Sequence, residues 1–334
     1  MTDDRPIIVL GCPRSGTTLL QVILHSHPRI AIPPENRFVL PAYRERLRFG
    51  DLKERANRRA LARFIVRRRG HRFRDLGLDR RRTIRQIVTG PPTVGSAIGI
   101  VLRAYAERFD RPRWGDKRPN YHSHIDVIMR LFPDAQIVHV VRDPRDCVAS
   151  LKRMKWWKLD SYHAMSAWAQ SIDHTDAAQR RWPGVLTRVR YERLVADPET
   201  ELRALCAALG EEYDPAMAEP ERVAPVAVPE RKHWHGNTRL SPTTKRVGSW
   251  RTELEPWEAA LCETVLAGRM RNLGYELDGT GRAALGHVAR YAAVDSARRL
   301  YRRKRLLQDR WDRRREPNPV AALLTQGQRS HARL

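Results

Sequence analysis

The sequence has few cysteines, no long apolar run and no leader segment, and each absence argues against a class of protein. The cysteines are scattered with no CxxC pair, which disfavours a disulfide scaffold and a cysteine zinc site; they are Cys12, Cys147, Cys206 and Cys262. No apolar stretch approaches the ~20 residues that a membrane-spanning helix needs. The first strand pattern starts at Ile7, which leaves no room for a signal peptide or an anchor. We therefore expect a cytoplasmic protein.

Acidic residues are scarce relative to basic ones. The chain has 38 Asp and Glu against 63 Lys and Arg, which gives a formal net charge of +25. Such an excess of positive charge invites a nucleic-acid-binding hypothesis. Most of the basic residues are arginine, which the codons of a GC-rich genome favour and which also binds phosphate or sulfate as a rigid bidentate fork. Composition does not separate these explanations, so the motifs have to decide.

The first motif is a strand, a glycine-bearing turn and a helix over residues 7–20, IIVLGCPRSGTTLL. The unpaired backbone N–H groups at such a turn favour an anion. The spacing from Gly11 to Gly16 matches the phosphate-binding loop GxxxxGK[ST] of nucleotide kinases, but Thr17 stands where that loop has its lysine. Arg14 supplies a cation inside the loop instead. The motif therefore predicts a site for a fixed oxyanion without ATP–Mg²⁺ chemistry.

The second motif is residues 137–151, IVHVVRDPRDCVASL. It predicts a buried strand that ends at Arg142, a turn at Asp143-Pro144 and a helix that carries Ser150. Open α/β sheets bind ligands at the carboxyl ends of their strands. We therefore expect Arg142 and Ser150 to lie near the first motif and to bind a second anionic group.

Together, PRSGTT and RDPRDxxxS resemble the two nucleotide-binding elements of sulfotransferases that use 3′-phosphoadenosine 5′-phosphosulfate. The chain is most similar to the bacterial branch related to tyrosylprotein sulfotransferases. The resemblance implies that the first motif binds the 5′-phosphosulfate and the second the 3′-phosphate. The residues so implied in nucleotide binding are Arg14, Ser15, Gly16, Thr17, Thr18, Arg142 and Ser150.

The resemblance also implies catalytic residues. Glu35, in HPRIAIPPENRF, stands at the position of the catalytic carboxylate of the tyrosylprotein branch. The resemblance implies that Glu35 is the general base for the acceptor hydroxyl. Lys117, in WGDKRPNY, stands at the position of the family lysine, where it would add a cation near the leaving oxygen or protonate it. Arg14 would neutralise charge near the bridging oxygen. His25 and His27 are alternative bases, because histidine titrates near neutrality.

Two later segments extend the resemblance. RYERLVADPETELRALCAALG implies that Tyr191 lies near the nucleotide, and TTKRVGSWRTEL resembles the loop that closes over the 3′-phosphate, with Lys245, Arg246 and Gly248. This last segment departs from the cytosolic small-molecule enzymes, which have Arg-Lys-Gly where this chain has Thr243-Thr244. Three His-x-His pairs, at positions 25/27, 122/124 and 233/235, have no carboxylate or cysteine cluster beside them. We therefore expect no metal site.

The patterns predict an α/β fold, with a P-loop-like, mostly parallel sheet flanked by helices. We expect one sulfotransferase domain over residues 1–280, with residues 41–113 as a basic helical insertion that caps the active site. A tryptophan-anchored helix is expected over 156–174 and a loop over 214–242. Residues 281–334 are expected to form a basic helical extension, dispensable for chemistry, with a flexible tail from residue 317. The segment 282–315 could pack on the domain, contact an anionic membrane or bind a partner.

The function that we expect is in-line transfer of a sulfuryl group from 3′-phosphoadenosine 5′-phosphosulfate to a hydroxyl acceptor, without a metal ion. The acceptor could be a carbohydrate, a lipid, a small metabolite or a peptide tyrosine. A P-loop nucleotide kinase is the alternative enzyme class, and the missing lysine counts against it. A basic nucleic-acid-binding protein is the alternative outside enzymes, and it gives no reason for two nucleotide motifs in this order.

Overall fold

The computed structural model describes residues 4–223 and 243–323, and its centre is a parallel sheet of five strands. The strands lie in the order β2-β3-β1-β4-β5, and every pairing between neighbours is parallel. Their bounds are β1 (Ile7–Gly11), β2 (Ile30–Ala31), β3 (Arg113–Lys117), β4 (Gln136–Val141) and β5 (Leu186–Arg190). This confirms the expected P-loop-like α/β class.

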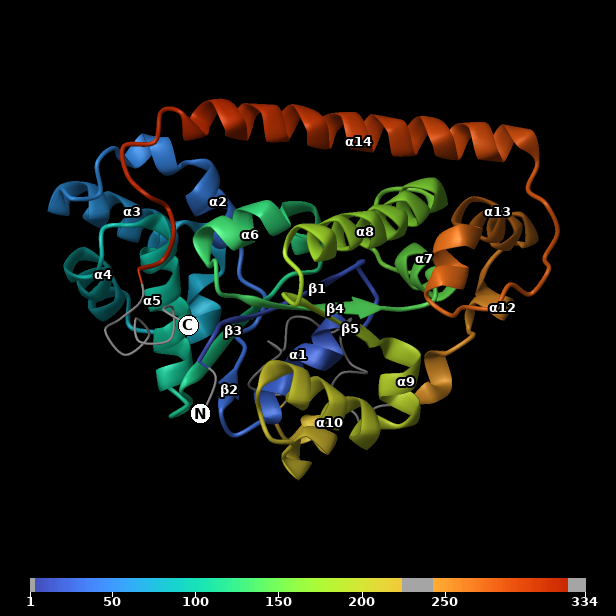
Figure 1. The fold of residues 1–334 in the computed structure, drawn as a ribbon, viewed down its shortest axis with the longest axis horizontal. Helices are drawn as coiled ribbons and strands as arrows, with labels where there is room; N and C mark the ends of the chain where they lie inside the picture. Colours follow the sequence, from blue (N-terminus) through green and yellow to red (C-terminus); the bar gives the residue numbers. More distant parts are fainter. Residues whose placement is uncertain (1–3, 224–242, 324–334) are drawn as a thin grey trace.

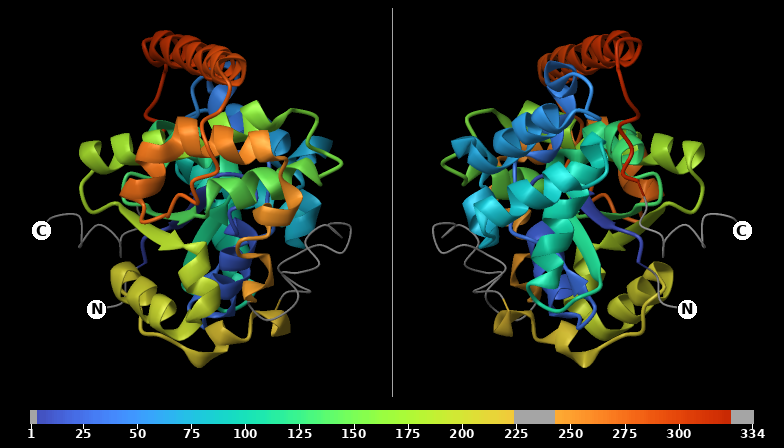
Figure 2. Two further views of the ribbon diagram at one scale, coloured as in Figure 1. Left: turned by 90° about the vertical axis from the view of Figure 1, so that its right-hand side faces the viewer. Right: turned by 90° about the vertical axis from the view of Figure 1, so that its left-hand side faces the viewer.

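Helices cover both faces of the sheet (Figures 1 and 2). In Figure 1, α6, α7 and α8 lie above the sheet, α1, α9 and α10 lie below it, and α14 crosses the top. The helix bounds are α1 (Thr17–Ser26), α2 (Val39–Arg44), α3 (Arg55–Arg67), α4 (Arg80–Thr89), α5 (Val94–Glu107), α6 (Ile125–Leu131), α7 (Pro144–Lys152), α8 (Ser161–Arg181), α9 (Tyr191–Ala196), α10 (Pro198–Leu209), α12 (Trp250–Glu253), α13 (Pro256–Asn272) and α14 (Leu285–Arg313). Within the described ranges, no helix combines the length and apolar character that crossing a bilayer requires.

The two central strands are those with the clearest sequence pattern. β1 and β4 are buried along their whole length, and Val9 pairs with Val138 in the middle of their ladder. Strands buried on both faces read as continuous apolar runs, which explains why these two are visible in the sequence. Because both strands run in the same direction, their carboxyl ends bring the loop after Gly11 and the turn after Val141 to one edge of the sheet.

Strand β3 is not visible in the sequence, because it carries charged residues that are nevertheless buried. Its first residue, Arg113, is fully buried; the guanidinium donates to Glu211 Oε1 at 3.0 Å and to the carbonyl of Leu209 at 2.8 Å. Partners far along the chain thus compensate the charge. The strand places Lys117 at its carboxyl end, beside β1.

Residues 41–113 contain α3, α4, α5 and most of α2, at the β2/β3 edge of the sheet. Their apolar residues share one core with strand residues, as Leu61 and Ile98 do with Ile8. The segment also contacts the stretch that carries Glu35, since the N–H of Arg37 donates to the carbonyl of His71 at 3.1 Å. Most of its arginine side chains point to solvent.

Two segments differ from expectation. The helix expected over 156–174 begins at Ser161, because the Asp160 carboxylate caps it by accepting from the N–H of His163 at 3.1 Å. Trp156 lies before this helix and is 46% exposed, so it is no anchor, whereas Trp168 is buried. The expected loop over 214–242 begins with two short 3₁₀ helices, Pro215–Ala218 and Pro220–Arg222. Residues 224–242, with His233 and His235, lie outside the described residues.

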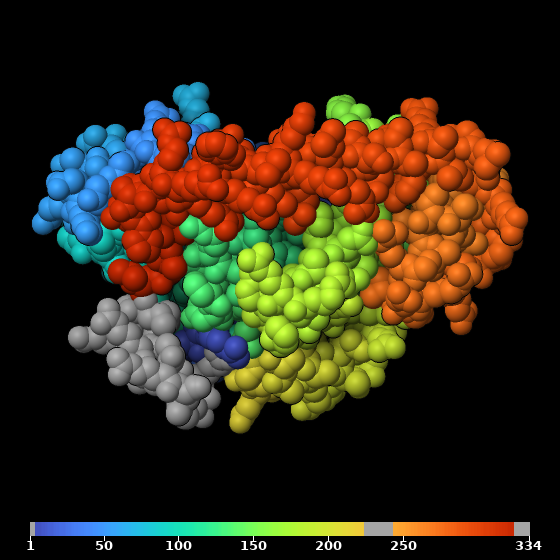
Figure 3. Space-filling view, turned by 45° about the horizontal axis from the view of Figure 1, so that its top comes forward, coloured from blue at the N-terminus to red at the C-terminus, as the bar shows by residue number. Residues whose placement is uncertain are grey.

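The C-terminal segment lies against the domain. Figure 3 shows α14 across one face of the molecule. After α14 the chain turns back to α5 and α6, and Val320 joins the core. The N–H of Gly95 donates to the carbonyl of Val320, and the N–H of Ala322 to the carbonyl of Leu131, both at 2.8 Å. Residues 317–323 therefore pack on α5 and α6, where a flexible tail was expected; residues 324–334 lie outside the described part. α14 and this segment form part of the folded domain.

Candidate active site

The loop between β1 and α1 is held in a tight conformation that only certain residues allow. Arg14 has a left-handed φ of 72°, and Gly16, at the start of α1, has a φ of 100°. A Cβ on Gly16 would lie 2.5 Å from Cδ2 of Tyr191, so this position also needs glycine for space. Tyr191 consequently packs directly on the loop.

The groups of this loop fit an oxyanion. α1 begins without a side-chain cap and without an acidic residue in its first turn, which leaves its N-terminal N–H groups open to an anion. Ser15 Oγ is buried and has no hydrogen-bond partner among the described residues, and the side chains of Thr17 and Thr18 are nearly buried beside it. A buried hydroxyl without a partner is unusual in a native structure, and a bound phosphate or sulfate oxygen would supply one.

Lys117 and Glu35 meet beside this loop. Lys117 Nζ lies 3.6 Å from Glu35 Oε2 and donates to Thr18 Oγ1 at 3.2 Å. The side chain of Lys117 is 1% exposed and that of Glu35 is 20% exposed, so the carboxylate keeps access to solvent or substrate. Burial lowers the pKa of Lys117, and the charges of Glu35 and Asp116 oppose that shift. Arg72, from the 41–113 segment, also lowers this pKa, which places one arginine of the segment near the site.

Arg14, Arg142 and Ser150 form a second cluster on the other side of the loop. Arg14 Nε donates to Ser150 Oγ at 3.0 Å, and Arg142 Nη1 donates to the carbonyl of Arg14 at 3.3 Å. The Arg142 guanidinium lies over the Tyr191 ring, 4.6 Å from its centroid. Burial, together with repulsion from Arg142 and Arg153, lowers the pKa of Arg14 to about 10. Two guanidiniums this close favour an anion between or beside them.

The segment that contains Lys245, Arg246 and Gly248 reaches this cluster in part. Arg142 Nη2 donates to the carbonyl of Arg246 at 2.5 Å, and the N–H of Gly248 donates to Asp146 Oδ2 at 3.0 Å. Lys245 is exposed, and its side chain makes no contact with Arg14 or Arg142 among the described residues. The backbone of the segment, more than its charges, therefore holds it to the site.

Asp146 was missed in the sequence although its position offered a signal. Its carboxylate lies 3.4 Å from Arg142 and also accepts the N–H of Trp250 at 3.0 Å. It thus fixes both Arg142 and the 248–250 segment. The i,i+4 spacing of an acid after Arg142, on a helix that begins at Pro144, was the available signal.

Asp116 was also missed, because an aspartate beside a lysine resembles a surface pair. It is fully buried and accepts three hydrogen bonds, from Asn36 Nδ2 at 2.7 Å, from the N–H of Lys117 at 2.9 Å and from Tyr121 OH at 2.6 Å. Burial raises the pKa of Asp116 to about 6. Because Asn36 follows Glu35 directly, Asp116 ties the Glu35 stretch to β3 and holds Glu35 beside Lys117.

The alternative bases, His25 and His27, bond to backbone groups. His25 Nδ1 accepts the N–H of Ile32 at 3.2 Å, and burial lowers the pKa of His25 to about 3. His27 Nδ1 accepts the N–H of Arg29 at 3.1 Å, and its Nε2 contacts the carbonyl of Glu212 at 2.9 Å. Both imidazoles therefore serve the local fold. Across the described ranges, no three His, Cys, Asp or Glu side chains gather as metal ligands would.

A family model described as "Sulfotransferase family" matches residues 6–215 of this chain. The chain belongs to the sulfotransferase family. It is 28% identical to the nodulation protein NoeE of Sinorhizobium fredii, over 92% of this chain and 73% of that protein. It is 25% identical to protein-tyrosine sulfotransferase A of Caenorhabditis elegans, over 65% of this chain and 53% of that protein. The sequence-based recognition of a sulfotransferase is confirmed, and with it the enzyme class.

Two solved structures share the fold. The sulfotransferase domain of the Synechococcus PCC 7002 olefin synthase superposes with a TM-score of 0.57 at 25% identity, covering 83% of this chain and 96% of that one. The sulfotransferase domain from the curacin biosynthetic pathway gives a TM-score of 0.56 at 21% identity, covering 83% of this chain and all of that one. The family assignment favours sulfuryl transfer over the nucleotide kinase and over the nucleic-acid-binding alternative.

Proposed function

We propose that this sulfotransferase moves the sulfuryl group of 3′-phosphoadenosine 5′-phosphosulfate to an acceptor hydroxyl, with Glu35 as the general base. The observation that carries the proposal is the pairing of Glu35 with Lys117 at 3.6 Å, beside the hydroxyl of Thr18 in the anion-binding loop. A carboxylate, a buried ammonium and an open helix N-terminus in one place are the groups that transfer of an anionic group needs.

The donor would lie across the loop, held at both ends by groups of this chain. The backbone N–H groups of 15–18 and the hydroxyls of Thr17 and Thr18 would bind the 5′-phosphate. Arg142 and Ser150 would bind the 3′-phosphate through charge-assisted hydrogen bonds. Tyr191 would line the nucleotide site where it packs on Gly16, and the turn at Arg246 and Gly248 would close over the 3′-phosphate. Lys245, which is exposed, would add charge at the rim.

In the transfer, the acceptor oxygen forms a bond to sulfur while the bond from sulfur to the bridging phosphate oxygen breaks. Glu35 accepts the proton of the acceptor hydroxyl. Lys117 and Arg14 offset the negative charge that develops on the leaving oxygen, and Lys117 can donate a proton to it. These fixed cations stand where a kinase uses magnesium, so we expect turnover to persist in EDTA.

Nucleotide binding tests the donor assignment most directly. Adenosine 3′,5′-bisphosphate should bind more tightly than AMP or ADP, because only the former carries the 3′-phosphate that Arg142 and Ser150 would recognise. Calorimetry on the wild type and on Ser150→Ala measures this discrimination. Equal affinity for the 3′-phosphorylated and unphosphorylated nucleotides would overturn the assignment.

The acceptor class stays open among carbohydrates, lipids, small metabolites and peptide tyrosines. A relative is named as a protein-tyrosine sulfotransferase, which supports testing peptide tyrosine first. Incubation of the enzyme with sulfur-labelled donor and fractions of a cell extract would identify the acceptor. Labelling confined to protein would support the tyrosine class, and labelling of the glycan or lipid fraction would exclude it.

The outer face of α14 supports a second, peripheral role at a membrane. Leu300, Leu307 and Trp311 are 53%, 54% and 65% exposed, and exposed basic residues such as Arg303 and Arg310 flank them. Exposed apolar side chains surrounded by basic residues are typical of helices that bind the surface of an anionic bilayer. We expect cosedimentation with phosphatidylserine vesicles but not with phosphatidylcholine vesicles, weakened by Leu307→Ser with Trp311→Ser. Equal binding to both vesicle types, or to neither, would contradict this role.

A further inference from the structure

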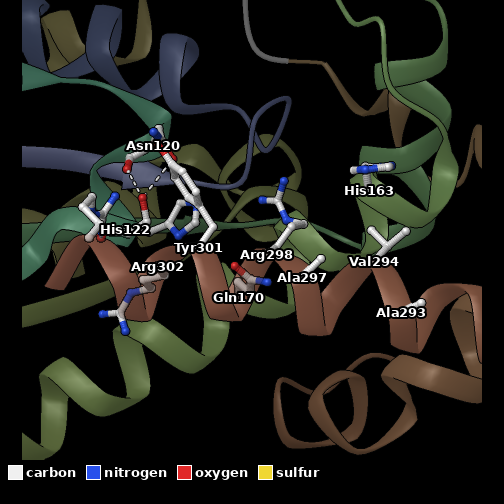
Figure 4. A pocket seen from close by; sticks show the side chains of 12 residues that line it. Asn120, His122, His163, Gln170, Ala293, Val294, Ala297, Arg298, Tyr301 and Arg302 are labelled. Carbon is white, nitrogen blue, oxygen red and sulfur yellow. Dashed lines mark hydrogen bonds between the residues drawn. The ribbon is translucent and has the colours of Figure 1, made fainter. Parts of the chain in front are cut away.

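A pocket of about 660 Å³ lies between α14, α8 and the 3₁₀ helix η4 (Pro119–His124). Figure 4 shows Asn120 and His122 of η4 on one side and Arg298, Tyr301 and Arg302 projecting from α14. Ala293, Val294 and Ala297 give it an apolar wall. The volume is within the range of sites that hold a small ligand.

The pocket adjoins the active site through two elements. η4 begins two residues after Lys117, so Asn120 and His122 follow the reactive end of β3 directly. α8 contributes Gln170 to the pocket, and two residues earlier its Trp168 donates from Nε1 to the carbonyl of Arg142 at 2.8 Å. Burial lowers the pKa of Arg298.

The arginines of α14 divide into two sets according to their partners. Arg299 lies 2.7 Å from Asp173 and 2.6 Å from Asp295, and Arg313 lies 2.6 Å from Asp309. Arg298 and Arg302 are half-buried as well, yet neither makes an ion pair or a hydrogen bond with the described residues, and both Nε atoms are buried without a partner. Asp295 attracts Arg298 and Asp126 attracts Arg302 only from beyond ion-pair distance. A half-buried guanidinium without a close counter-charge is costly. Two of them at one pocket fit an anionic ligand.

We propose that this pocket binds an anionic group, such as a sulfate, phosphate or carboxylate, that the acceptor carries in addition to the hydroxyl to be sulfated. This inference rests on the proposed function and narrows its acceptor to small anionic molecules. Arg298 supplies the principal charge and Arg302 a second one. Asn120 and Ser123, whose side chains line the same pocket, offer hydrogen bonds to further hydroxyl groups.

Binding of sugar probes tests the inference without requiring turnover. The donor site is first saturated with adenosine 3′,5′-bisphosphate, and glucose 6-sulfate, glucose 6-phosphate and glucose are then titrated by calorimetry. The two anionic sugars should bind more tightly than glucose. Arg298→Gln should weaken their binding about tenfold or more, since it removes charge-assisted hydrogen bonds, and adding Arg302→Gln should weaken it further. Arg303→Gln, on the exposed face of the same helix, is the matched control and should leave it unchanged.

Thermal stability separates a binding role from a structural one. Because Arg298 makes no ion pair with the part of the chain that the structure describes, Arg298→Gln should leave the melting temperature of the free protein unchanged or raise it, while reducing the stabilisation that glucose 6-sulfate provides. Equal loss of binding in Arg298→Gln and Arg303→Gln, or no binding of either anionic sugar by the wild type, would overturn the pocket assignment.

The outcome for the pocket is distinguishable from that for the proposed function. If the anionic sugars bind in an Arg298-dependent way but no sulfate transfer is found, the proposed activity is refuted and the anion pocket is supported. If sulfate is transferred but Arg298→Gln changes the KM of neither anionic nor neutral acceptors, the anion pocket is refuted and the proposed activity is supported.

Discussion

Arg142, just after the end of β4, and Arg299, in the middle of α14, each lie four residues along the chain from an aspartate. Arg299 is shared by Asp295 and Asp173, at 2.6 and 2.7 Å. Arg142 lies 3.4 Å from Asp146, whose carboxylate also accepts two backbone N–H groups. Within the described ranges, the side chain of Arg14 beside it bonds to the hydroxyl of Ser150 and to no carboxylate. Arg299 thus has two carboxylate partners, whereas Arg142 and Arg14 together have one at ion-pair distance within the described ranges.

This difference separates two uses of one residue type. A matched ion pair fixes a helix to its neighbours but leaves nothing for a ligand. A cluster with excess positive charge is unfavourable until an anion binds, and such groups gather at functional sites. The arginine content of the chain therefore does not identify a ligand site, and we expect an excess of guanidinium groups over carboxylates to mark one. The four predictions below test the strand-end site against the α14 contacts.

The largest effect is expected at the strand-end site. Glu35→Gln should lower kcat by roughly 10²–10⁴, the usual range for a lost general base, with unchanged affinity for adenosine 3′,5′-bisphosphate. Steady-state kinetics and calorimetry measure the two quantities. Glu107→Gln, at an exposed position, is the control. Near-normal turnover in the Glu35 variant would show that another group removes the proton. Glu35 would then matter no more for catalysis than the contacts of α14 do.

The α14 contacts should affect folding and leave nucleotide binding intact. Arg46 is buried and pairs with Asp309 at 2.9 Å and with Glu316, at the end of the helix segment. Arg46→Ala removes a buried partner from both carboxylates, which then keep only Arg313 and Arg130 as ion-pair partners among the described residues, and should lower the free energy of unfolding by about 2 kcal/mol. Urea denaturation measures this, with exposed Arg310→Ala as the control. A variant that kept its stability but lost nucleotide affinity would show that the two regions are not separate.

The pH dependence should report on Lys117. Burial lowers the pKa of Lys117, so its ammonium loses its proton at a lower pH than a free lysine does. If the protonated form supports catalysis, kcat should fall about tenfold per pH unit once the pH rises through that lowered pKa. Lys117→Arg should shift or remove this alkaline decline, since arginine keeps its charge. A decline unchanged in Lys117→Arg would assign it to another group.

The smallest effect is expected at the exposed arginines of the 41–113 segment. If this segment caps the acceptor site, Arg67 and Arg69 would steer an anionic acceptor by long-range attraction, which salt screens beyond ~8–10 Å. The acceptor kcat/KM should then decrease several-fold from low to high salt at nearly constant kcat. Replacing both residues with Glu should reproduce the decrease at low salt. Flat kinetics across the salt range would leave these arginines without a role in catalysis.

The sequence predicted the parts of the site that local patterns specify. The glycine spacing from Gly11 to Gly16 and the β-branched runs of β1 and β4 identified the loop, the sheet and the edge at which Arg142 would lie. Strand β3 was not predicted, because charged residues such as Arg113 and Asp116 are usually exposed. Their burial depends on partners elsewhere in the chain, such as Glu211 and Tyr121. For the same reason no local pattern distinguishes Arg298 from Arg299. The counter-charge that separates them comes from Asp173, on another helix.

The return of the chain to α5 after α14 has a consequence for biosynthesis. The N–H of Gly95 bonds to Val320, and a Cβ at Gly95 would lie 2.4 Å from the backbone nitrogen of Ala322, so this corner is built to receive the C-terminal segment. On the ribosome, residues up to α6 emerge long before residue 322 is made. At usual rates of synthesis the corner stays open for roughly 10–40 s. The nascent protein must avoid aggregation over that interval. We therefore expect the segment with Val320 and Ala322 to affect the yield of folded protein in the cell.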